Sequence, residues 1–138
     1  MKTLEAYFDE LWVKGNVAAI PALLSPDART RGVMGEVTLN QADLEELVTM
    51  VRELLGPIEV SFPVKVEQGD WISALVEIKS HSAISGAPVH VFNHMIARFE
   101  GHQMIEIYSG VDSLMLFEQL GLLPENALAV MLSGTRLG

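Results

Sequence analysis

Four strand-like segments joined by short turns fill the middle of this chain, and they limit its fold more than any other feature. Apolar and polar residues alternate from Ile58 to Glu67, as they do in a strand with one buried face. Pro63 interrupts that strand and predicts an edge position or a bulge. Turns this short join antiparallel neighbours, so the segments are expected to form a meander. The other predicted strands cover 71–81, 89–99 and 104–111.

Helical segments precede and follow this meander. The best marked begins at Asn40, where Asp43 has the spacing of a capping box, and Gly56-Pro57 ends it. Helices, then a meander, then a helix give an α+β order. We expect a curved antiparallel sheet wrapped around the N-terminal helices, a cone with an internal pocket, in a single domain of residues 1–138. The predicted helices cover 3–15, 16–24, 40–55, 113–120 and 124–131.

Composition excludes several classes of protein. The net charge is −9 and the nine basic residues are scattered, so we expect no nucleic-acid partner. No apolar run approaches the roughly 20 residues that cross a membrane, so we expect no membrane partner. The chain has no cysteine, and its N-terminal segment lacks the features of a signal peptide. A cytoplasmic protein without a metal or other cofactor is the expectation.

Two segments of the chain carry a family resemblance. YFDELWVKGNVAAIPALLSPD and GHQMIEIYSGVDSLMLFEQLGLLP resemble the SnoaL-like polyketide cyclases of the nuclear-transport-factor-2-like superfamily, which have a cystatin-like fold. The resemblance implies an acid–base Asp at the end of the last strand, and Asp112 falls there. It also implies a partner His on the preceding strand. Met95 stands at that position, with His94 one residue away, so only a local bulge would turn His94 inward.

Ketosteroid isomerases share this layout, but their functional positions are not matched here. The resemblance places their Tyr and two Asp residues on Phe8, Gly32 and Met95. None of these three residues has a side chain that carries a proton or donates a hydrogen bond. Steroid-isomerase chemistry of that kind is therefore not expected.

Asp112 is the central candidate, and two interpretations of it stay open. It precedes a helix, and Asp is among the best N-cap residues. Alternatively, it is a catalytic acid whose pKa is raised by burial beside apolar groups. Phe8, Trp12 and Met95 are the candidate apolar, substrate-binding residues around it.

The last strand adds two candidate substrate-binding residues. Strict alternation places Glu106 and Tyr108 on the same face as Met104 and Asp112. Tyr108 would then orient a ligand carbonyl or pack in the core with its hydroxyl satisfied locally. Glu106 would be a second pocket acid, a partner of Arg98 across the hairpin, or a residue of the outer face.

The third strand decides which polar groups face the pocket. If Met95 faces inward, Asn93 does so too and can bind a ligand carbonyl. His90 and His94 would then point outward, to a face that suits a dimer interface. His90 and His94 are also about 13 Å apart in a strand, which is too far to share one metal ion.

Three hypotheses about function follow. The first is an enzyme, similar to a polyketide cyclase, in which Asp112, with His94 as a possible partner, performs acid–base catalysis on a small hydrophobic molecule with polar substituents. The second is a non-catalytic module that binds such a molecule. The third is an adaptor that binds a protein through the outer sheet face. A homodimer is expected.

Overall fold

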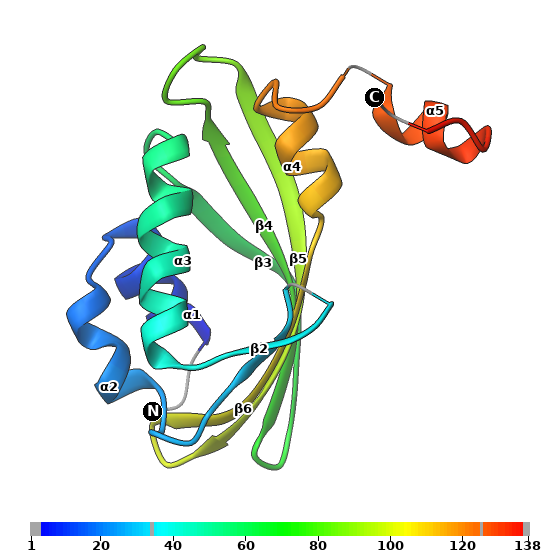
Figure 1. The fold of residues 1–138 in the computed structure, drawn as a ribbon. Helices are drawn as coiled ribbons and strands as arrows, with labels where there is room; N and C mark the ends of the chain where they lie inside the picture. Colours follow the sequence, from blue (N-terminus) through cyan, green and yellow to red (C-terminus); the bar gives the residue numbers. More distant parts are fainter. Residues whose placement is uncertain (1–3, 34, 125, 137–138) are drawn as a thin grey trace.

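The computed structural model describes residues 4–33, 35–124 and 126–136. Helices and strands follow the predicted order, and Figure 1 shows α1, α2 and α3 on one side of a curved sheet. The elements are α1 (Leu4–Tyr7), the π-helix η1 (Phe8–Val13), the 3-10 helix η2 (Val17–Ala19), α2 (Ile20–Leu23), β1 (Thr30–Gly32), β2 (Gly35–Leu39), α3 (Gln41–Leu54), β3 (Glu59–Gln68), β4 (Trp71–His81), β5 (Pro88–Glu100), β6 (Gln103–Val111), α4 (Ser113–Gln119) and α5 (Ala127–Leu132).

The sheet has six strands in the order β2-β1-β6-β5-β4-β3. Strands β3 to β6 form the predicted antiparallel meander. The short strand β1 adds to β6 in the parallel direction, so the sheet as a whole is mixed. Pro63 lies on an edge strand at a register shift, which satisfies both expectations for it. The α+β class is confirmed. The parallel pair of β1 and β6 was not predicted, because the segment after α2 has no regular pattern.

The N-terminal helix is wider than expected from Phe8 onward, because η1 is wound as a π-helix. Its last carbonyl groups find a partner on α3. Arg52 donates from Nε to the carbonyl of Trp12 at 3.0 Å and from Nη2 to the carbonyl of Val13 at 3.1 Å. Gly15 follows with a φ of +72°, and a Cβ there would lie 2.1 Å from Nη1 of Arg52. The predicted cap at Thr3 lies outside the described residues.

Helix α3 begins at the predicted capping box. The Asn40 side chain accepts from the Asp43 amide at 2.8 Å, and the Asp43 carboxylate accepts from the Asn40 amide at 3.1 Å. Leu44 and Val48 point from this helix into the core. None of the helices in the described part of the chain is long and apolar enough to cross a membrane.

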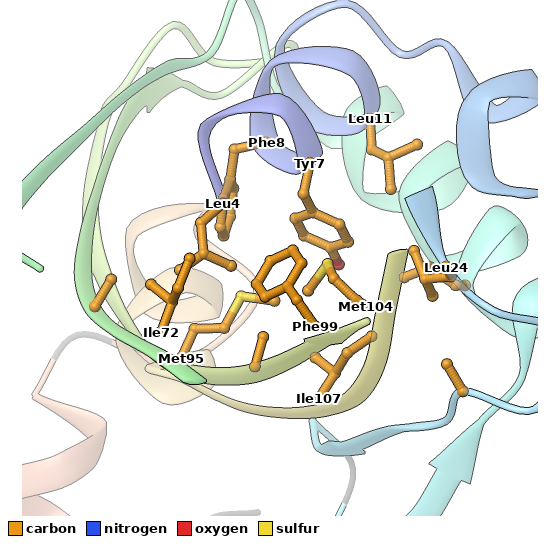
Figure 2. Close-up of a cluster of buried hydrophobic side chains, with 14 of the residues drawn as sticks. Leu4, Tyr7, Phe8, Leu11, Leu24, Ile72, Met95, Phe99, Met104 and Ile107 are labelled. Atoms are coloured by element: carbon orange, nitrogen blue, oxygen red, sulfur yellow. The ribbon is translucent and has the colours of Figure 1, made fainter. Parts of the chain in front are cut away.

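The main core lies between the N-terminal helix and the concave face of the sheet. Figure 2 shows side chains of this helix meeting those of the sheet strands. The helix supplies Leu4, Tyr7, Phe8 and Leu11, and the strands supply Ile72, Met95, Phe99, Met104 and Ile107.

A second, smaller cluster fills the other end of the concave face. There Leu116 of α4 packs with Val89 and Val91 of β5 and with Leu55 and Ile58 before β3. The concave face thus carries two apolar clusters, one beneath the N-terminal helix and one beneath α4.

Candidate ligand-binding site

One polar pair interrupts the apolar concave face. Among the described residues of strands β3 to β6, the buried polar side chains are Asn93 and Ser109, which are 7% and 8% exposed. Ser109 donates its hydroxyl hydrogen to Oδ1 of Asn93 at 3.1 Å. The predicted inward orientation of Asn93 and Met95 is confirmed, because both side chains are buried.

This pair leaves hydrogen-bonding capacity unused. The Asn93 amide group has two N–H donors, and none of the described residues accepts a hydrogen bond from them. Asn93 lies between Val91 of the second cluster and Met95 of the main core. A carbonyl or hydroxyl oxygen of a ligand would satisfy these donors where the two clusters meet.

Several apolar side chains that pack against the two clusters are only partly buried. Val60 and Ile78 pack against both clusters and keep part of their surface exposed. Trp12 is partly exposed beside the main core, as Val51 and Met115 are beside the second cluster. Partly exposed apolar side chains on facing elements are the usual lining of a ligand site. The predicted substrate-binding residues differ here. Trp12 is partly exposed, Phe8 and Met95 are buried in the core, and Asn93 is the buried polar residue described above.

A bulge places Glu106 and Tyr108 on the outer face, so the prediction that they share a face with Met104 is wrong. Arg98 pairs with Glu106, but the next residue, Phe99, pairs with Met104, so Ile105 is an extra residue in β6. Beyond the bulge the alternation is inverted, and Ile107 and Ser109 are the inward residues. Strict alternation from Met104 could not detect this.

Glu106 is the centre of a hydrogen-bonded group on the outer face. Its Oε1 accepts from Nη2 of Arg98 at 2.7 Å, and its Oε2 accepts from the Tyr108 hydroxyl at 2.8 Å. These bonds, first that from Tyr108 and then that from Arg98, lower the pKa of Glu106, and the hydrogen bond to Glu106 raises the pKa of Tyr108. Of the three alternatives expected for Glu106, the structure therefore shows the pair with Arg98.

Asp112 is exposed and caps α4. Its side chain accepts a hydrogen bond from the amide of Met115 at 3.1 Å. His94 is also exposed, as expected for an outward residue, and lines an outer-face groove together with Asp112. The acid–base hypothesis needs Asp112 inward and partly buried, which is not its position. The cap interpretation agrees with the structure, and the catalytic roles of Asp112 and His94 stay predictions.

The three positions that the resemblance assigns to isomerase chemistry have the wrong residue types, and they also leave no room for a ligand-binding side chain. Phe8 and Met95 are buried in the main core. At Gly32, φ is +94°, and a Cβ would lie 2.5 Å from the carbonyl oxygen of Ser109. No side chain fits at Gly32 unless β1 moves away from β6.

Two residues of the interior were not among the sequence candidates. Ser109 was missed because its orientation depends on the bulge at Ile105. Tyr7 was missed although its spacing from Leu4 and Leu11 places all three on one side of the helix. Its burial raises the pKa of the Tyr7 phenol to about 12, so the group stays protonated at neutral pH.

Comparisons with known proteins place the fold. No protein-family model and no curated protein matches the chain. Solved structures do: a candidate polyketide cyclase from Bacillus cereus is 18% identical, with a TM-score of 0.73 over 83% of this chain and 75% of that one. A candidate polyketide cyclase from Streptomyces antibioticus is 16% identical, with a TM-score of 0.72 over 84% and 94%.

A SnoaL-like polyketide cyclase from Agrobacterium tumefaciens is similar over its entire length. It is 15% identical, with a TM-score of 0.67 over 88% of this chain and 100% of that one. At such identities the likeness establishes the fold alone. The chain therefore has the fold of the SnoaL-like polyketide cyclases, as its sequence resemblance implies.

Proposed function

We propose that this protein binds a small, mostly hydrophobic molecule on the concave face of its sheet, beside Asn93 and Ser109, and does not use Asp112 for acid–base chemistry. The observation that carries the proposal is the Asn93 amide, which lies on an apolar surface and whose N–H donors find no acceptor among the described residues. A ligand oxygen would give these donors a partner.

The chemistry of the ligand follows from these neighbours. Partly exposed Trp12, Val60 and Ile78 favour a flat or bulky apolar body. The amide of Asn93 favours one carbonyl or hydroxyl oxygen on that body. A hydroxylated fused-ring ketone has both properties, and the structural neighbours are named as cyclases of polyketides.

The absence of titratable groups supports binding over catalysis. Among the buried side chains of the described strands β3 to β6, there is no carboxylate and no imidazole. Tyr7 has a raised pKa and would act as a donor only. A bound ketone could therefore be held by hydrogen bonds, but none of these buried strand residues would remove its proton.

Tryptophan fluorescence tests this proposal. The chain has two tryptophans, so Trp71→Phe leaves Trp12 as the only one. We expect 1,8-dihydroxyanthraquinone to quench Trp12 in a saturable way. In that background Ser109→Ala should change the affinity, since it alters the hydrogen bonding of Asn93, whereas Ser73→Ala on the outer face should leave it unchanged.

Two results would contradict the proposal. One is quenching that does not saturate. The other is an equal effect of Ser109→Ala and Ser73→Ala, measured on variants whose circular dichroism spectra match that of the parent.

A further inference from the structure

The end of the N-terminal helix is held by one side chain from a distant part of the sequence. Arg52 of α3 donates from Nε to the carbonyl of Trp12 at 3.0 Å and from Nη2 to the carbonyl of Val13 at 3.1 Å. The last carbonyl groups of a helix have no partner within that helix, and a guanidinium is a strong, charged donor for them. Arg52 therefore fixes the end of η1 to α3.

The backbone that follows η1 has the shape that this guanidinium needs. Gly15 has a positive φ, and a Cβ at Gly15 would overlap Nη1 and Cζ of Arg52. A glycine accepts both the left-handed backbone and the close approach of the guanidinium. The contact between Arg52 and the end of η1 thus depends on residues of both segments.

The π-helical winding determines where the Trp12 side chain points. The Lys14 amide donates to the carbonyl of Asp9, five residues earlier, at 2.9 Å. In an α-helix, two residues that are five apart lie about 140° apart around the axis. The wider turn of a π-helix brings them nearer to one side, so that the indole N–H of Trp12 donates to the hydroxyl of Tyr7. Tyr7 lies within the core (Figure 2), so this bond holds Trp12 beside the core.

The same helix forms one wall of a cleft that is large enough for a small molecule. The cleft has a volume of about 450 Å³ and lies between η1 and the edge strand β3. Val13 lines it from η1, and Val60 lines it from β3. Val60 is also one of the partly exposed residues of the proposed ligand site. Arg52 therefore binds the carbonyl of one cleft residue, Val13, and that of its neighbour Trp12.

The bond to Tyr7 limits what Trp12 can offer to a ligand. An indole has one N–H donor and no acceptor, and the Tyr7 hydroxyl takes that donor. The faces of the indole ring remain for contact, and aromatic rings pack on one another in preferred geometries that a saturated ring lacks.

We propose that Arg52 is a positioning residue for ligand binding, which holds Trp12 and Val13 where a flat aromatic ligand packs against the indole ring. This inference rests on the proposed function. It adds a preference for planar aromatic ligands, and it names a residue of α3 that controls the affinity without touching the ligand.

Binding of 1,8-dihydroxyanthraquinone in the Trp71→Phe background tests the role of Arg52. Arg52→Met should weaken binding by about tenfold, because the ligand must then order the end of η1. It should also shift the emission of Trp12 to longer wavelength, since the released indole becomes more exposed to water. Arg29→Met is the matched control, because Arg29 also donates two hydrogen bonds to backbone carbonyls, but within its own segment. It should change neither the affinity nor the emission.

Two conservative variants separate positioning from stability. Arg52→Lys keeps a charged donor at the end of η1 and should restore most of the affinity that Arg52→Met loses. Tyr7→Phe keeps the buried ring and removes only the acceptor of the indole N–H. It should shift the Trp12 emission and weaken binding while Arg52 is intact. These two variants carry the test if Arg52→Met does not fold.

Several outcomes would overturn the proposal. If Arg52→Met has the parent's circular dichroism, affinity and Trp12 emission, Arg52 only caps a helix. Equal losses of affinity from Arg52→Met and Arg29→Met would mean that the effect is one of general stability. If Ser109→Ala changes the affinity but Arg52→Met does not, the ligand site stands and the role of Arg52 alone is wrong. A Trp71→Phe parent without saturable quenching would refute both.

Discussion

Met95 distinguishes a packed core from an open ligand cavity, because the two predict different costs for removing its side chain. The residue is 1% exposed and lies among Phe8, Phe99 and Met104 in the main core. We expect Met95→Ala to lower the free energy of unfolding by about 2–5 kcal/mol, the usual cost for a fully buried methionine. For a chain of 138 residues, 1 kcal/mol corresponds to about 3–4 °C in Tm, so the shift should be about 10 °C.

Urea unfolding followed by far-ultraviolet circular dichroism measures this difference. Met50→Ala is the control, since Met50 is 61% exposed, and its effect should stay within about 0.5 kcal/mol. A loss below about 1 kcal/mol for Met95→Ala would refute the reasoning. It would mean that Met95 lines an open cavity and that the predicted substrate-binding role fits it better than core packing does.

Three other substitutions test separate parts of the structure. Glu106→Gln should lower Tm at pH 7. Because the pKa of Glu106 is lowered in the fold, that difference should fade as pH drops below about 4.3 and through the folded value; a difference that does not change with pH would contradict this. Asp112→Ala should cost about 1 kcal/mol in urea unfolding and Asp112→Asn much less, because Asn caps equally well; equal losses would exclude the cap. Gly32→Ala should cost roughly 1–3 kcal/mol more than Gly69→Ala, since only at Gly32 would a Cβ meet backbone; equal thermal shifts would contradict this.

The strands and the capping box could be predicted because local chemistry determines them. Alternation predicted β4 to the residue, and Asn40 with Asp43 marked the start of α3. The parallel pairing of β1 with β6 could not be predicted, because three residues carry no pattern and the contact joins distant parts of the chain. The π-helical winding of η1 and the bonds from Arg52 to its last carbonyl groups could not be predicted either, because Arg52 is distant in sequence.

The candidate site was predicted only in part, because alternation assigns side chains to a face correctly only where no bulge interrupts the strand. On β5 the alternation is unbroken, so the orientations of Asn93, His94 and Met95 followed from the sequence. On β6 it is broken, so the faces of Glu106 and Tyr108 were assigned wrongly. Nothing in the residue types at the break marks it, since a bulge is a property of the pairing between two strands.

The extra residue Ile105 also has a genetic consequence. Loss of that one codon would join Met104 directly to Glu106, which already pairs with Arg98, so every later pair of β5 and β6 would be kept. Glu106 and Tyr108 would stay on the outer face, and Ser109 would stay inside. A single-codon deletion would thus remove the local kink and extra twist of a bulge without changing which side chains face the interior.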